Sequence, residues 1–110
     1  RRSEIEILDD QGKKTGLFIN VGGMDSKEFR SHTKRHQKAY IEALREKKDF
    51  DEESMMIQGL LDCTIGWRGT DEKFTKKLCK ELYTKAPYIR DQIDTFMGER
   101  ENFTKAKPKT

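Results

Sequence analysis

Polar and apolar residues alternate at the start of the chain. Residues 3–8 (SEIEIL) follow the period of two that is typical of a half-buried strand. Residues 16–21 (GLFINV) are rich in the aromatic and β-branched side chains that favour strands. Turn-forming residues 9–14 separate the two segments, and Gly22-Gly23 ends the second. The pattern predicts an antiparallel hairpin, which is marginal alone and is expected to pack on another element or another chain.

A charged helix is predicted to follow the hairpin. Asp25 or Ser26 can cap a helix that begins near Lys27, and the lysines at 47–48 suit its negative C-terminal end. Its less polar positions recur near helical spacing and are expected to face the core. They are Phe29, His36, Tyr40, Ala43 and Leu44.

The most apolar part of the chain is predicted to form a second, central helix. Three acids at residues 51–53 suit its start, and Gly66 and Gly69 are expected to end it around Trp67. Its apolar face comprises Met55, Met56, Leu60, Leu61, Thr64, Ile65 and Trp67.

Two shorter helices complete the predicted fold. Thr75 can cap a third helix, and Pro87 suits the first turn of a fourth, which carries an apolar stripe at Ile89, Ile93, Phe96 and Met97. We therefore expect a mainly α (α+β) protein, an N-terminal β-hairpin followed by about four short helices packed as a small bundle. Residues 1–103 are expected to form one domain and residues 104–110 a flexible, lysine-rich tail.

Composition narrows the functional class. The chain has 110 residues, of which 33% are hydrophobic and 39% charged, so one modest core is expected. The net charge of +3 equals the charge of the three lysines in residues 103–110, and residues 1–102 balance to zero. A neutral body disfavours a nucleic-acid-binding domain. No segment approaches the ~20 apolar residues of a membrane span, and no targeting peptide is recognisable, so we expect a cytosolic protein.

The residues that could carry chemistry have simpler structural explanations. His32 and His36 are four apart, but no third metal ligand is evident, so we expect His36 to be half-buried beside Tyr40 and His32 to be exposed. Cys63 and Cys79 lie among apolar neighbours and are expected to be buried free thiols. No phosphate-binding glycine motif occurs. We expect no catalytic residues, no metal and no cofactor.

Protein binding is the functional class that remains. Aromatic and methionine side chains near helix junctions are candidate contacts, with core packing as the alternative for each. They are Phe50, Met55, Met56, Trp67, Phe74 and Phe103. A basic patch on the first helix could contact phosphate or an acidic partner, although an ordinary exposed face explains it better. It comprises Arg30, Lys34, Arg35 and Lys38.

The order of the motifs resembles a known family. Residues 23–30 (GMDSKEFR), 65–69 (IGWRG), 74–75 (FT), 86–93 (APYIRDQI) and 101–103 (ENF) follow one another with the spacing found in tail assembly chaperones of long-tailed phages and prophages. The resemblance spans roughly residues 3–103. Each motif is weak alone, and their order carries the likeness.

The resemblance implies a non-enzymatic protein that binds the tape measure protein, keeps it soluble and helps to recruit tail tube proteins. Such a chaperone acts in the host cytoplasm and is absent from the mature virion. Two alternatives stay open: a small basic nucleic-acid-binding protein, and a structural tail or neck component of the virion. The marginal hairpin also favours self-association into a homo-oligomer, as rings or spirals.

Overall fold

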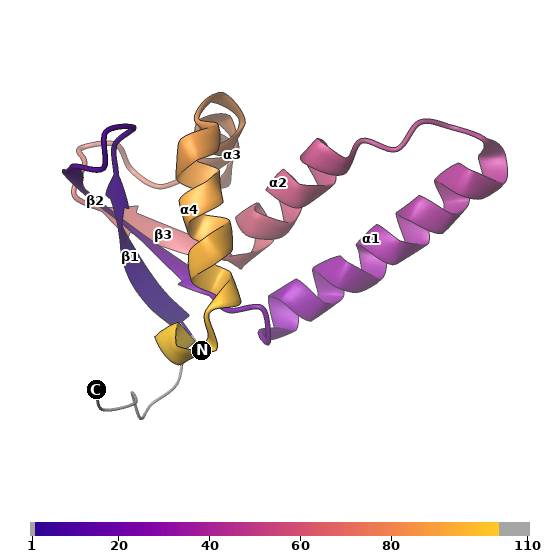
Figure 1. Ribbon diagram of the computed structural model, residues 1–110, viewed down its shortest axis with the longest axis horizontal. Helices are drawn as coiled ribbons and strands as arrows, with labels where there is room; N and C mark the ends of the chain where they lie inside the picture. Colours follow the sequence, from indigo (N-terminus) through magenta and orange to yellow (C-terminus); the bar gives the residue numbers. More distant parts are fainter. Residues whose placement is uncertain (1, 104–110) are drawn as a thin grey trace.

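The computed structural model describes residues 2–103, which form a three-stranded sheet and four α-helices (Figure 1). The α+β class, the N-terminal hairpin and the four helices are as predicted. In chain order the elements are β1 (Arg2–Leu8), β2 (Lys14–Gly22), α1 (Lys27–Glu46), α2 (Glu52–Cys63), β3 (Thr64–Arg68), α3 (Lys76–Lys85), α4 (Pro87–Gly98) and a 3₁₀ turn η1 (Arg100–Phe103). The expected tail, residues 104–110, lies outside the described residues.

The hairpin closes as its sequence predicts. β1 and β2 pair antiparallel, with Ile5 opposite Ile19. In the turn, Gly12 adopts φ +81°, and Asp9 Oδ1 accepts the backbone N–H groups of Gln11 and Lys13 at 2.9 Å each. The turn therefore uses glycine for a left-handed conformation and aspartate as a local acceptor.

The second helix is shorter than predicted. It ends at Cys63, and residues 64–68 form β3, which pairs antiparallel with β2 in the order β1-β2-β3. The expectation that Thr64, Ile65 and Trp67 lie on a helix is wrong. Gly66 would destabilise the interior of a helix. As a strand, residues 64–68 instead pair with the free edge of β2 and place Trp67 opposite Ile19.

A lysine closes the junction between α2 and β3. Lys76 Nζ donates to the carbonyl oxygens of Leu61 at 2.6 Å and Thr64 at 2.8 Å. The Leu61 oxygen also accepts the backbone N–H of Thr64, so the lysine adds a second donor where α2 ends. Lys76, the first residue of α3, thus links the last turn of α2 to the first residue of β3.

The helix starts agree with the predicted caps. Ser26 caps α1 by accepting the N–H of Phe29, and Thr75 caps α3 by accepting the N–H of Leu78. Asp51 does the same for α2 through the N–H of Ser54. Pro87 occupies the first turn of α4. These local signals were readable because each cap acts within three residues of the helix start.

The core lies between the sheet and the helices α2, α3 and α4. Its buried side chains come from β1, β2, α2, α3 and α4, and they include both cysteines. Tyr83 is fully buried, and its hydroxyl lies 2.7 Å from Thr64 Oγ1. In Figure 1 the sheet lies on the left with α4 beside it, and the α1/α2 pair extends to the right, away from the sheet.

His32 is buried, which corrects the expectation that it is exposed. It is 6% exposed and is the buried residue of α1, because its ring lies over Gly59 of α2, where no side chain intervenes. His36 is half-buried, as expected. The glycine allows the two helices to approach closely at this point.

No helix among residues 2–103 is long and apolar enough to cross a membrane.

Candidate protein-binding surfaces

The surface of residues 2–103 exposes several large apolar side chains. At least a third of the surface of each is accessible to solvent, and they come from strands, helices and loops alike: Leu8, Met24, Tyr40, Ile41, Leu44, Ile65 and Tyr88. Three of them lie within five residues on one helix. A concentration of this kind is typical of a protein-binding surface, whereas single exposed apolar residues are ordinary.

The three residues form what we call the α1 ridge: Tyr40, Ile41 and Leu44. They are 44%, 53% and 61% exposed. The sequence pattern predicted that Tyr40 and Leu44 face the core, and the structure places them outside it. α1 has 20 residues and α2 has 12, so at 1.5 Å per residue α1 extends beyond the helix that covers its first half.

Phe50 fixes the base of the ridge. Its ring packs edge-to-face against His36 at 5.2 Å and against Tyr40 at 5.3 Å between centroids. The loop after α1 is thereby held against the helix, on the side next to the ridge. Phe50 is half-buried, so its first role is to hold this loop.

The predicted basic patch divides over two sides of α1. Arg35 pairs with Asp62 of α2, and Arg30 donates to the carbonyl oxygen of Asp25 at 2.9 Å. Lys34 and Lys38 instead border a shallow hollow beside Ile41, together with Arg45. Arg35 therefore faces α2, whereas Arg30, Lys34 and Lys38 recur every four residues along another side of α1, and the two lysines flank the ridge.

Charge is distributed unevenly between α1 and the rest of the protein. Residues 27–48 contain eight basic and three acidic residues, a net charge of +5. The other residues between 2 and 103 contain eleven basic and seventeen acidic residues, a net charge of −6. The near-neutral total hides this separation. We call residues 27–48 the arm, and the apolar ridge thus lies on a strongly positive segment.

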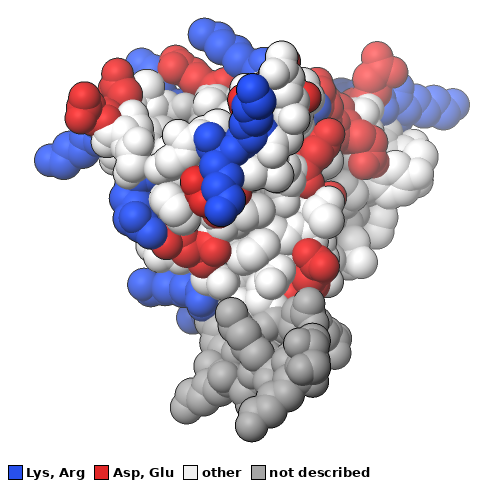
Figure 2. Space-filling model, turned by 60° about the vertical axis from the view of Figure 1, so that its left-hand side comes forward, with Lys and Arg blue, Asp and Glu red and all other residues white. Residues whose placement is uncertain are grey.

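A second apolar surface lies on the sheet side of the molecule. We call it the β1/α4 groove, an open hollow of about 550 Å³. Its apolar lining comes from Ile5, Leu8 and Phe96, and its rim carries three acids and one lysine: Glu6, Asp91, Glu99 and Lys14. Figure 2 brings this side forward and shows white surface interrupted by red acidic and blue basic groups.

Gln92 closes the sheet edge inside this groove. Its side-chain oxygen accepts the N–H of Leu8 at 2.8 Å, and its side-chain nitrogen donates to the carbonyl oxygen of Leu8 at 2.9 Å. The amide thus occupies both backbone groups that a neighbouring strand would use. The groove is therefore suited to side chains rather than to a further strand paired at Leu8.

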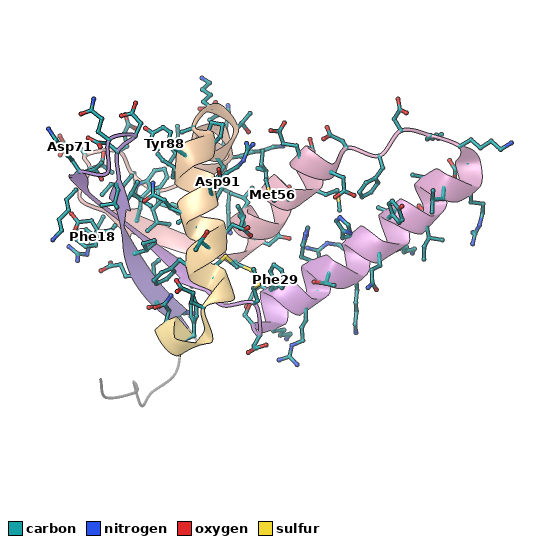
Figure 3. All side chains as sticks on the ribbon, in the orientation of Figure 1. Phe18, Phe29, Met56, Asp71, Tyr88 and Asp91 are labelled. Atoms are coloured by element: carbon teal, nitrogen blue, oxygen red, sulfur yellow. The ribbon has the colours of Figure 1, made fainter. Side chains whose placement is uncertain are left out.

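The other predicted contact residues are half-buried, and three of them serve internal packing. Trp67 donates its Nε1–H to the carbonyl oxygen of Glu72 at 2.8 Å and meets Phe74 edge-to-face at 5.0 Å. Phe103 packs on Phe96 at 5.5 Å, and a Cβ added to Gly23 would approach its ring to 3.0 Å. The same half-buried state holds for Met55 and Met56 on α2, the latter labelled in Figure 3.

The sequence analysis did not identify the ridge or the groove as exposed surfaces, and it assigned Leu44 to the core. The ridge could have been found by comparing the predicted lengths of the first two helices, since the longer one must extend past its cover. The groove could not, because it joins β1 to a helix about 85 residues later in the chain.

Both cysteines are buried and free, as predicted. Burial raises the pKa of the Cys63 thiol, and it raises that of Cys79 as well. A raised pKa keeps each thiol protonated and poorly nucleophilic at neutral pH.

His32 also has a structural setting. Its Nδ1 lies 4.0 Å from Asp62 Oδ2 and has no hydrogen-bond partner. Burial lowers the pKa of His32, and Arg35 and His36 lower it further, although Asp62 opposes them. Within residues 2–103, no three His, Cys, Asp or Glu side chains are grouped as metal ligands.

Comparison with protein-family models, with curated proteins and with solved structures finds no match to the chain.

Proposed function

We propose that the protein is a non-enzymatic tail assembly chaperone of a long-tailed phage or prophage. It binds the tape measure protein in the host cytoplasm, keeps that protein soluble, helps to recruit tail tube subunits and is not retained in the virion. The observation that carries the proposal is the set of large apolar side chains exposed on several elements, Met24, Ile65 and Tyr88 among them. A protein that coats a long amphipathic partner needs such contacts on its surface.

The motifs behind the family resemblance have structural roles in this chain. Ser26 caps α1, Thr75 caps α3, and Phe103 packs over Gly23. Gly69 adopts φ +91° where the chain leaves β3. The resemblance therefore rests on residues that shape the fold, which is consistent with a shared architecture whose partner contacts differ.

Co-expression tests the proposal. The chain is produced together with a tape measure protein, a long protein rich in coiled coil, with an affinity tag on one of the two. We expect the long protein to be soluble and to co-purify only when the chain is present. The proposal fails if the long protein is equally soluble alone and does not bind. Mass spectrometry of mature particles gives a second test, because a stoichiometric amount of this chain there would indicate a structural tail or neck component.

Nucleic-acid binding is the second candidate, and the net charge of +5 on residues 27–48 favours it. The ridge argues against it, because apolar side chains lie among the basic ones. A gel-shift titration with duplex DNA in 50 mM and 200 mM salt decides. Binding that weakens steeply with salt would support this candidate, and no retention in low salt at high protein concentration would remove it.

A further inference from the structure

The α1 ridge and the β1/α4 groove lie at opposite ends of the molecule. In Figure 1 the far end of α1 is on the right, whereas β1 and α4 are on the left. The longest dimension is 47 Å, so the ridge of one copy cannot enter its own groove. Any complementarity between the two surfaces acts between molecules.

The two surfaces are complementary in their apolar parts. The ridge offers Ile41 and Leu44, more than half exposed on a helix. The groove is lined by Ile5, Leu8 and Phe96, and its volume of about 550 Å³ lies in the range of pockets that accept small ligands. A few aliphatic side chains fit a space of this size.

They are also complementary in charge. Lys34, Lys38 and Arg45 border the ridge, and Asp91 and Glu99 are exposed at the groove. Figure 3 labels Asp91 on α4, the helix that forms one wall of the groove. The net charges of +5 on residues 27–48 and −6 on the other residues between 2 and 103 extend this complementarity beyond the rim.

Pairing of two arms is disfavoured. A symmetric contact of ridge with ridge would bring two segments of charge +5 together, and like charges at such a contact are unfavourable. Two other hollows near the start of α1 carry Lys27 and Lys76, so they oppose a basic arm as well. The β1/α4 groove combines an apolar lining with an acidic rim.

We propose that copies of the protein associate head to tail, with the α1 ridge of one copy docked in the β1/α4 groove of the next. The occupant of the groove is thus a second copy of this chain. Such an interface uses different surfaces on its two sides, so in a pair of copies one keeps a free ridge and the other keeps a free groove. Repetition generates a row, which closes into a ring or continues as a helix according to the angle between neighbours.

Sedimentation velocity on the purified full-length chain tests the association. We expect the mean mass to rise with protein concentration in 50 mM NaCl and to fall at 500 mM NaCl, because salt screens the charged rim. A chain that remains monomeric at every concentration in low salt would overturn the proposal.

Two variants separate the halves of the interface. The ridge variant is Ile41→Glu with Leu44→Glu, and the groove variant is Asp91→Lys with Glu99→Lys. All four positions are exposed, so both proteins should fold, which circular dichroism checks. We expect each variant alone to associate at least about tenfold more weakly than wild type, a loss equal to 1.4 kcal/mol or more.

Mixing the two variants is the decisive experiment. The groove variant keeps an intact ridge and the ridge variant keeps an intact groove, so the mixture should form a 1:1 dimer that grows no further. An oligomerising wild type whose mixed variants form no dimer would overturn the assignment of these surfaces. Lys77→Gln with Lys80→Gln changes the net charge by the same −2 as the ridge variant and should associate like wild type.

The inference stands apart from the proposed chaperone function. Self-association is measured without any partner, whereas the pull-down measures binding to the tape measure protein. Failure of one experiment leaves the other result intact.

Discussion

His32 of α1 packs its ring directly over Gly59 of α2. A Cβ built on Gly59 would lie 2.5 Å from His32 Nε2, well inside van der Waals contact. The ring cannot retreat easily, because Phe29 and His36 lie on either side with ring centroids 6.1 Å away. The absence of a side chain at Gly59 therefore determines how closely α1 can approach α2.

Gly59→Ala is expected to destabilise the fold by about 1–3 kcal/mol, the usual cost of overpacking. Urea denaturation followed by circular dichroism measures the loss. Gly66→Ala is the matched control, since a Cβ there meets no atom within 4 Å, and it should change stability by less than about 1 kcal/mol. Equal effects of the two substitutions would contradict this account.

His32 should make stability depend on pH. Because burial lowers its pKa in the folded chain, the unfolded chain takes up a proton first, near pH 6.5. The free energy of unfolding then falls as the pH drops below that value, by at most about 1.4 kcal/mol per pH unit for one proton.

Urea denaturation at pH 7.5 and 5.5 checks this prediction. We expect His32→Gln to lose less stability between the two pH values than wild type. His36→Gln keeps the buried His32 and should therefore retain more of the wild-type loss than His32→Gln does. If all three proteins lose the same amount, other groups control the pH dependence.

At the scale of elements, the predictable features were those with local causes. The hairpin turn, the helix caps and the helix starts each depend on residues a few positions apart, so they could be predicted from short stretches of sequence. β3 depends instead on the free edge of β2, more than 40 residues earlier, and its apolar residues continue the pattern of α2. The ridge was assigned to the core because Tyr40 and Leu44 have the helical spacing of buried residues, although α2 is too short to cover them.

The junction after β3 depends on Gly69. It adopts φ +91°, and a Cβ there would lie 1.8 Å from the carbonyl oxygen of Gly16. Gly69→Ala should therefore cost about 3 kcal/mol or more, from backbone strain and a backbone clash together. Gly12→Ala shares the positive φ but meets no atom within 4 Å, so thermal or urea unfolding should show a loss of only about 1 kcal/mol. Similar losses would show that the clash is relieved by movement of the strands.

The outer half of α1 should open more readily than the sheet. Of the residues in α1 only His32 is buried, whereas β2 contributes Ile19 and Val21 to the core. Hydrogen exchange measured by mass spectrometry should show faster exchange for residues 38–46 than for residues 17–22. Equal protection would mean that the arm unfolds only with the whole protein.

At the scale of the whole molecule, charge position matters more than total charge. Lys34→Glu with Lys38→Glu and Lys77→Glu with Lys80→Glu lower the net charge equally, but only the first pair lies on the positive arm. On a cation-exchange column at pH 7, the arm variant should elute at lower salt than the α3 variant. Identical elution would show that the column senses net charge alone.

The 3₁₀ turn that ends the described chain contacts the first strand, and Phe103 packs over Gly23 at the end of β2. The two ends of the fold are therefore neighbours, while the α1–α2 loop lies at the far end of the arm (Figure 1). A circularly permuted gene could join these ends through a short linker and open the chain between Lys48 and Asp49. The arm would then become the carboxyl-terminal segment, where it could be shortened turn by turn without cutting through the core.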